Sequence, residues 1–128
     1  MPETRKPTIL VVDDDPLDRD LFRKLLQGAG YAVVESGSGK EALDAIANTS
    51  LDLIVLDLNM PEMDGLELLR EARHMPKPKI IAVTGLTPVL GDRILEAARL
   101  LGAAATLDKF WARDLLLPTV RKLLGSSD

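Results

Sequence analysis

Cysteine is absent from this chain of 128 residues, which excludes a disulfide framework and a thiolate metal site. No apolar run approaches the length of a membrane-spanning helix, and the polar start, residues 1–8, lacks the apolar core of a signal peptide. A block of basic residues is also lacking, and the formal net charge is −4, which argues against an electrostatic footprint for nucleic acid. We therefore expect a soluble cytoplasmic protein that binds neither nucleic acid nor membrane.

Apolar residues make up 46% of the chain, enough for one folded domain over residues 1–128 with a core from about residue 8 to 124. Short apolar runs bounded by turn residues alternate with segments of helical periodicity. The expected strands are Thr8–Val12, Tyr31–Val34, Leu53–Leu56, Ile80–Val83 and Ala103–Leu107. Because a helical segment follows each strand, the pattern predicts a parallel sheet with helices on both faces.

Helical spacing also predicts which side chains face the core. The first helix is expected to start at Pro16, after the potential cap Asp15, and to end at Gly28 and Gly30. The fourth opens at Pro88, and Pro118 is expected near the start of the last. The expected inward residues, helix by helix, are Leu17, Leu21, Phe22, Leu25 and Leu26; Ala42, Leu43, Ile46 and Ala47; Leu66, Leu69, Ala72 and Met75; Ile94, Ala97, Ala98 and Leu101; and Leu115, Leu116, Val120, Leu123 and Leu124.

Polar residues stand where four of the expected strands end: Asp13–Asp15, Asp57 with Asn59, Thr84, and Lys109. The carboxyl ends of parallel strands form the rim where such sheets bind ligands. Carboxylates gathered there repel one another unless a cation joins them, and oxygen ligands without His or Cys suit Mg²⁺. A lysine and a hydroxyl suit the phosphate oxygens that Mg²⁺ accompanies. Each residue alone has an ordinary structural explanation, as a turn, a cap or a surface charge, but their joint occurrence at matching strand ends favours a site.

The chain resembles the receiver domains of two-component response regulators from about Thr8 to Leu124. The motifs that carry the resemblance are ILVVDDD (residues 9–15), DLNMPEMDG (residues 57–65), Thr84 with Gly85, and Lys109. The resemblance implies an α/β flavodoxin-like fold, a doubly wound five-stranded parallel sheet of strand order 2-1-3-4-5 with five helices. It further implies a single-domain response regulator similar to chemotaxis regulators.

The resemblance also implies a role for each residue of the rim. Asp57 would accept the phosphoryl group, and Thr84 and Lys109 would hold phosphoryl oxygens. Asp13 and Asp14 would be the acidic pair that binds Mg²⁺ together with Asp57 and the backbone carbonyl of Asn59. A carboxylate nucleophile, a bridging Mg²⁺ and a nearby lysine agree with the chemistry of in-line phosphoryl transfer.

The expected phosphodonor is a histidine kinase or a histidine phosphotransfer protein. The phosphorylated state would then change protein–protein contacts, since only a polar tail follows the last helix. The family suggests a contact face built by the helix after Pro88, the strand at 103–107 and the last helix. Such a protein is not a turnover enzyme, although it catalyses its own phosphorylation and dephosphorylation.

Four positions depart from the family pattern or bear on its mechanism. Phe110 follows the lysine where the family usually has proline, so we expect a trans peptide bond and a different loop. Thr106 stands where relatives often carry a switching aromatic residue, and Asp108 either pairs with Lys109 or points away. Leu86 flanks the expected path of the hydrolytic water, and because it cannot orient that water we expect slow loss of the phosphoryl group.

Two other functions remain open from the sequence alone. A pseudo-receiver that is never phosphorylated would share the fold, and the changes at Thr106 and Phe110 are compatible with it. A small Mg²⁺-dependent phosphatase could use Asp57 as its nucleophile. Asn59 argues against the phosphatase, because such enzymes commonly place a second acid there.

Overall fold

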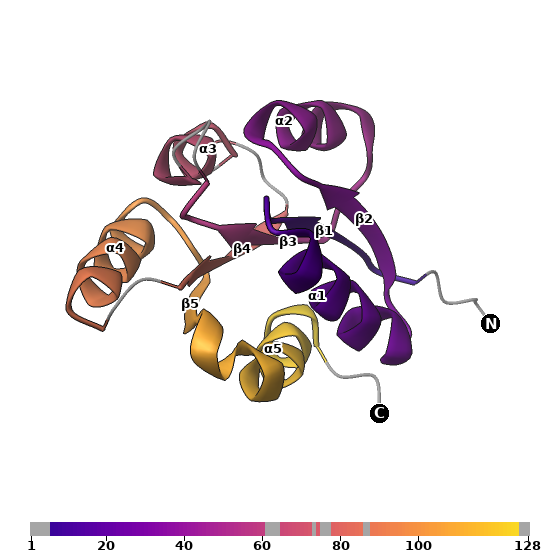
Figure 1. Cartoon of the computed structure of the whole chain (residues 1–128). Coiled ribbons are helices and arrows are strands. Elements are labelled where there is room, and N and C mark those ends of the chain that lie inside the picture. Colours follow the sequence, from indigo (N-terminus) through magenta and orange to yellow (C-terminus); the bar gives the residue numbers. More distant parts are fainter. Residues whose placement is uncertain (1–5, 61–64, 73, 75–77, 86–87, 126–128) are drawn as a thin grey trace.

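The computed structural model describes residues 6–60, 65–72, 74, 78–85 and 88–125. Five parallel strands form one sheet in the order β2-β1-β3-β4-β5. The elements alternate as β1 (Thr8–Val12), α1 (Pro16–Gly28), β2 (Ala32–Ser36), α2 (Gly39–Asn48), β3 (Leu53–Asp57), α3 (Gly65–Ala72), β4 (Lys79–Thr84), α4 (Pro88–Leu100), β5 (Ala105–Asp108) and α5 (Lys109–Leu124). This arrangement confirms the doubly wound sheet, its strand order and its five helices (Figure 1).

The helices lie in two layers, one on each face of the sheet (Figure 1). Alternate residues of β1 face opposite layers of helices. Leu10 and Val12 pack with α2, α3 and α4, whereas Ile9 and Val11 pack with α1 and α5. The central strand β3 is buried at all five positions. A strand covered on both faces needs apolar side chains at successive positions, which is why its sequence reads as one continuous apolar run.

Local caps stabilise the starts of α1 and α2. The Asp15 side chain accepts a hydrogen bond from the backbone N–H of Leu17 at 2.9 Å, and Pro16 follows in the first turn. The Ser38 hydroxyl accepts from the backbone N–H of Glu41 at 3.2 Å at the start of α2. These bonds satisfy donors that have no partner within the helix, so α1 begins at the rim as predicted.

Three of the residues expected to face the core are exposed. The side chain of Leu17 is 80% exposed and that of Leu115 is 45% exposed, and Ala47 also lies on the surface. Leu17 lies in the first turn of α1, beyond the edge of the sheet, and in α5 the buried stripe is Ala112, Leu116 and Val120 instead. Met75, expected to extend the inner face of the third helix, lies outside the described residues.

The last helix differs most from the expectation. It begins at Lys109, directly after β5, so Pro118 lies in its interior and not near its start. Proline has no backbone N–H to donate to the carbonyl of Asp114, and its ring is on the exposed side of the helix. Next to it, the Thr119 hydroxyl donates to the carbonyl of Leu115 at 2.7 Å. The edge strands also shift: β2 begins at Ala32 and β5 at Ala105.

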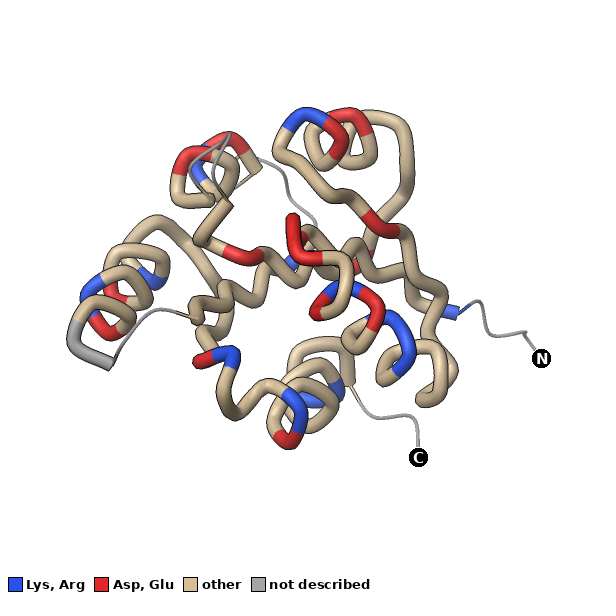
Figure 2. The backbone as a smooth tube through the Cα atoms, in the orientation of Figure 1, with Lys and Arg blue, Asp and Glu red and all other residues tan. Residues whose placement is uncertain are grey.

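Every helix carries charged residues of both signs (Figure 2). On α1 they form a connected set, in which Arg23 pairs with Asp20 and lies 3.3 Å from Glu35 of β2. Arg19 lies 3.2 Å from the same Glu35 and donates to the backbone carbonyl of Asp13 at 2.7 Å. The start of α1 is therefore tied to the ends of both β1 and β2. Within the described part of the chain, every helix is too short or too polar to cross a membrane.

Candidate functional site

Three carboxylates meet at the carboxyl ends of β1 and β3. One oxygen from each of Asp13, Asp14 and Asp57 lies within 4.8 Å of the others. The two strands are neighbours in register, Val12 opposite Leu56, so the residues that follow them emerge side by side. Asp13 and Asp57 are almost fully buried, whereas Asp14 is exposed. The structure therefore brings together the acidic residues that the sequence predicted for one rim.

Backbone hydrogen bonds hold this rim in place. The N–H of Asp13 donates to the carbonyl of Ser36 at 3.1 Å, and the N–H of Leu58 donates to the carbonyl of Val83 at 2.8 Å. Each carboxylate also accepts a bond from its own loop: Asp13 Oδ1 from the N–H of Asp15, and Asp57 Oδ1 from the N–H of Asn59, both at 2.9 Å. One oxygen of each buried acid is thus fixed, and the other is turned toward the site.

Lys109 supplies the positive charge of the site. Its Nζ lies 2.8 Å from Asp18 Oδ2, 3.0 Å from Asp13 Oδ2 and 3.3 Å from Asp57 Oδ2. Burial of the ammonium lowers the pKa of Lys109, but the nearby carboxylates of Asp18, Asp13 and Asp57 outweigh that effect and raise the pKa overall. Lys109 is therefore a permanent cation at any pH at which the protein works.

Asp18 is the site residue that the sequence analysis did not find. It lies in the first turn of α1, and its Oδ2 is 2.8 Å from Lys109 Nζ. One signal was available: the cap at Asp15 starts a helix at the acidic rim, and a residue three positions later lies on the same side of that helix.

Asp13 Oδ2 is buried and accepts no hydrogen bond from the described residues. The Lys109 ammonium is close enough for an ion pair at 3.0 Å, but it lies outside hydrogen-bond geometry. Burial and the nearby charge of Asp57 raise the pKa of Asp13 to about 6, against the hydrogen bond from Asp15 and the lysine. A buried carboxylate oxygen without a donor, beside two other carboxylates, fits a hard cation such as Mg²⁺.

Thr84 lies at the end of β4 and is almost fully buried. Its hydroxyl donates to Asn59 Oδ1 at 2.6 Å, and the same oxygen accepts from the N–H of Gly85 at 3.3 Å. The Asn59 side chain therefore bridges the loop after β3 to the end of β4. The side-chain oxygen of Asn59 is thus engaged by two donors at the end of β4.

Gly85 lies beside the stem of Lys109. A Cβ atom at position 85 would be 3.4 Å from Cδ and 3.7 Å from Cβ of Lys109, which is ordinary van der Waals contact with the stem. Asp108, which from the sequence could either pair with Lys109 or point away, caps α5: its Oδ1 accepts from the N–H of Phe110 at 2.8 Å. The lysine consequently projects from the first turn of a helix.

Two further departures from the family pattern, Thr106 and Phe110, differ in their exposure. Thr106 is half-buried in β5, and Phe110 is 85% exposed and packs edge-on against Trp111 with ring centroids 5.9 Å apart. Leu86, expected to flank the approach of water, lies outside the described residues. These aromatic rings are on the surface, beside the lysine that they follow.

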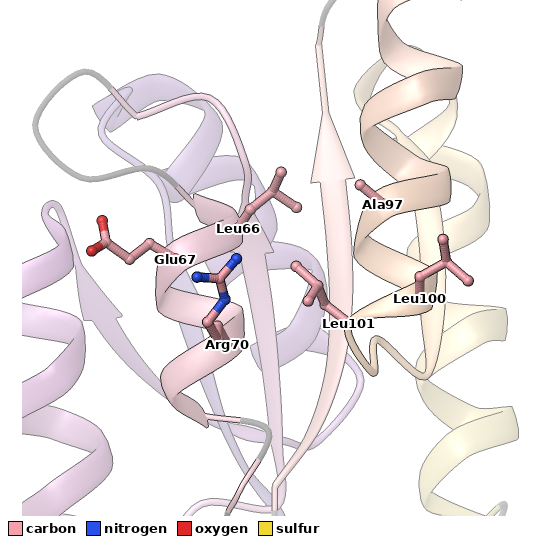
Figure 3. A pocket seen from close by; sticks show the side chains of 6 residues that line it. All are labelled: Leu66, Glu67, Arg70, Ala97, Leu100 and Leu101. Atoms are coloured by element: carbon pink, nitrogen blue, oxygen red, sulfur yellow. The ribbon is translucent and has the colours of Figure 1, made fainter.

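The described residues line a hollow away from the acidic rim and another beside it. One, of about 480 Å³, lies between α3 and α4, where Leu66 and Leu101 face each other and Arg70 and Glu67 stand at its edge (Figure 3). It contains none of the rim residues. The other, of about 340 Å³, lies between α1 and α5 and is lined by Asp18 and Lys109. The second hollow opens directly onto the candidate site.

Comparisons with known proteins agree with the fold. A family model of the response regulator receiver domain matches residues 9–121. The polar-differentiation response regulator DivK of Brucella ovis is 33% identical over 126 residues, which cover 94% of this chain and 98% of DivK. A structure of the response regulator TrrA from Thermotoga maritima in complex with Mg²⁺-BeF is 36% identical, with a TM-score of 0.77 over 91% of this chain and 98% of that one. The chemotaxis response regulator CheY4 of Vibrio cholerae has a TM-score of 0.82 at 29% identity, over 93% of this chain and 99% of that one.

Proposed function

Because the chain belongs to the response regulator receiver family, we propose that Asp57 accepts a phosphoryl group from a histidine kinase or a histidine phosphotransfer protein. The observation that carries the proposal is the position of its carboxylate, 3.3 Å from Lys109 Nζ and within 4.8 Å of the acidic pair Asp13 and Asp14. A nucleophile beside a fixed cation and a cation-binding acidic pair is the arrangement that phosphoryl transfer requires.

In the proposed transfer, a carboxylate oxygen of Asp57 forms the new bond to phosphorus as the phosphorus–nitrogen bond of the donor histidine breaks. The released imidazole nitrogen takes up a proton from solvent, and the product is an acyl phosphate. Asp57 Oδ1 already accepts from the N–H of Asn59 at 2.9 Å, which fixes the orientation of the nucleophile before the donor arrives. Holding a reactant in its reactive geometry accounts for a large part of catalysis.

Lys109 and Thr84 hold the transferred group. The ammonium that contacts Asp57 at 3.3 Å is placed to contact an oxygen of a phosphoryl group on that residue. The Thr84 hydroxyl has to turn away from Asn59 Oδ1, to which it donates at 2.6 Å. Asp13, Asp14, Asp57 and the Asn59 carbonyl would hold Mg²⁺, which when bound supplies the positive charge that neutralises the phosphoryl oxygens. The complex of the similar TrrA with Mg²⁺-BeF supports this assignment.

The phosphorylated domain would act through protein–protein contacts and not through turnover of a small substrate. We propose residues 1–128 as one receiver unit in the cytoplasm, with the face of α4, β5 and α5 as its output surface. Relatives of this kind, such as DivK and CheY4, are described as response regulators. We propose that the partners of this domain are proteins and not nucleic acid or membrane.

The test is incubation with Mg²⁺ and a small acyl-phosphate donor, followed by intact-protein mass spectrometry. We expect one phosphoryl group, released by hydroxylamine as acyl phosphates are. Asp57→Asn should abolish labelling, whereas Asp92→Asn, on the exposed part of α4, should label normally. Undiminished labelling of Asp57→Asn at the same site would refute the acceptor, and no labelling of the wild type would favour a pseudo-receiver. Continuous release of phosphate from a phosphomonoester would favour a phosphatase.

A further inference from the structure

We propose that Asp18 is a positioning residue for Lys109: it holds the ammonium at the mouth of the site from before phosphoryl transfer until after it. The proposal rests on the function proposed above and adds a residue that the family resemblance did not supply. The carrying observation is the ion pair between Lys109 Nζ and Asp18 Oδ2, which at 2.8 Å is the shortest of the lysine's three carboxylate contacts.

Asp18 differs from Asp13 and Asp57, the other two partners of Lys109, because it can keep its contact with the lysine throughout the reaction. Asp13 and Asp57 would both turn to Mg²⁺, and Asp57 loses its carboxylate charge when it is phosphorylated. A lysine ammonium has three N–H donors, so it can contact a phosphoryl oxygen and keep its bond to Asp18. Asp18 is thus the one carboxylate of the three that can hold the lysine through every step.

The ammonium of Lys109 has to be held in position by an opposite charge and not by packing. The lysine projects from the first turn of α5, capped by Asp108, and its stem crosses Gly85, which offers no side chain to confine it. On the side of α1 the site opens into the hollow of about 340 Å³. A flexible four-carbon stem beside open space needs an opposite charge to keep its ammonium in place.

Asp18 stands on a rigid support. The first turn of α1 is capped by Asp15 at 2.9 Å, and Arg19 ties it to the carbonyl of Asp13 at 2.7 Å and to Glu35 at 3.2 Å. A group that positions another must itself be fixed by its neighbours. The carbonyl that Arg19 contacts belongs to Asp13, which is also a residue of the proposed acidic pair. The contacts that fix Asp18 therefore also fix the acidic pair.

The experiment compares the rate of phosphoryl uptake, at saturating Mg²⁺ and acyl-phosphate donor, in five proteins: wild type, Asp18→Asn, Asp18→Glu, Asp20→Asn and Asp57→Asn. Asp18→Asn should slow uptake about three- to fivefold, as expected for a half-exposed ion pair. Its half-saturating Mg²⁺ concentration should change less than about twofold, because Asp18 is not one of the three carboxylates that cluster as the candidate Mg²⁺ ligands. Asp18→Glu keeps the charge and should restore the rate to within about twofold.

Asp20→Asn is the matched control. Asp20 lies on the same helix, pairs with Arg23 and Lys24 and does not contact Lys109, so its loss should leave uptake unchanged. Asp18 also places a negative charge in the first turn of α1, which favours the helix. To separate the two roles, Asp18→Asn is repeated in a Lys109→Met background, where a positioning role predicts no further slowing.

The outcomes are distinguishable. An Asp18→Asn rate equal to or above that of the wild type would overturn the positioning role, as would slowing that persists without Lys109 or fails to recover in Asp18→Glu. In each of those cases, labelling that still depends on Asp57 leaves the proposed function standing. If the wild type takes up no phosphoryl group, the proposed function and the role of Asp18 fall together.

Discussion

At the scale of single residues, Asp13 stores unfavourable energy in the metal-free protein. Its side chain is fully buried, and one of its oxygens accepts no hydrogen bond from any residue that the structure describes. Lys109 favours the charged form, but burial outweighs it and raises the pKa of Asp13 from 3.8 to about 6. The folded protein therefore binds a proton at Asp13 more tightly than the unfolded chain does. By linkage, this contribution to stability is complete below about pH 4 and is lost as the pH rises through about 6.

Asp13→Asn should remove that pH dependence. Without Mg²⁺, the stability of the variant relative to the wild type should rise by about 2 kcal/mol between pH 4 and pH 7.5. The free energy of unfolding is measured at each pH by urea denaturation with a chelator present, with Trp111 fluorescence as the signal. Asp92→Asn, an exposed acid on α4, should give a difference that does not vary in this way. If the difference in stability between Asp13→Asn and the wild type does not change with pH, burial does not raise the pKa of Asp13.

The sequence predicted Asp13, Asp14, Asp57, Asn59, Thr84 and Lys109 as site residues because each follows a strand whose end is marked by an abrupt change from apolar to polar residues. The structure brings them together, while their chemical roles stay predictions. Asp18 could not be found in this way, since it follows no strand. Its contact with Lys109 joins residues far apart in the chain, and it depends on how α1 and α5 lie across one face of the sheet.

At the scale of elements, α3 starts against the backbone that carries Asp57. A Cβ atom at Gly65 would overlap Leu58 Cα and lie only 2.8 Å from the carbonyl oxygen of Asp57. These obstacles are backbone atoms of the central strand's end, which cannot move without moving the site. Glycine is therefore needed here for close approach of two backbones and not for an unusual φ angle.

Gly65→Ala should lower the free energy of unfolding by about 3 kcal/mol, the upper part of the range for overpacking. It should also slow phosphoryl uptake at Asp57, because relief of the clash displaces the loop after β3. Gly28→Ala is the control: a Cβ there meets no atom within 4 Å, and stability should stay equal or rise by up to about 1 kcal/mol. Denaturant unfolding measures the stability of both variants. Equal stabilities would contradict the close approach of Gly65 to the backbone of Asp57 and Leu58.

Elements whose signals are local were predicted well from the sequence. β1 was predicted with its observed bounds, and β3 and β4 differ by one or two residues at their ends, because continuous apolar runs and turn residues bound them. The start of α5 was missed because exposed Phe110 and Trp111 mask the narrow buried stripe that begins at Ala112. Pro118 pointed to a helix start, whereas the helix tolerates it on its exposed side. Packing on the sheet outweighed local propensity there.

At the scale of the whole molecule, the site and the proposed output face are joined by β4 and β5. Thr84 pairs with Asp108 in the register of these strands, and Asp108 caps α5. A ligand shifts a conformational equilibrium only by contacts that differ between the two states. The contact that differs here is the Thr84 hydroxyl, which donates to Asn59 in the free protein and would donate to a phosphoryl oxygen in the other state. Thr106 offers no comparable change, since its side chain is too small to fill or vacate an aromatic-sized space.

Binding of Mg²⁺ with beryllofluoride, a phosphoryl mimic, should therefore change amide hydrogen exchange in α4 through Thr84 and not through Thr106. Thr84→Val keeps the shape of the side chain and removes the hydroxyl, so it should reduce the change in α4 by at least about half while leaving the mimic bound. Thr106→Val is the matched control, and its α4 should respond as in the wild type. Hydrogen exchange read by mass spectrometry, with and without the mimic, resolves the helix as separate peptides. A full response in Thr84→Val together with a lost response in Thr106→Val would place the switch in β5, and the route from Asp57 to α4 would then run through the half-buried Thr106 side chain.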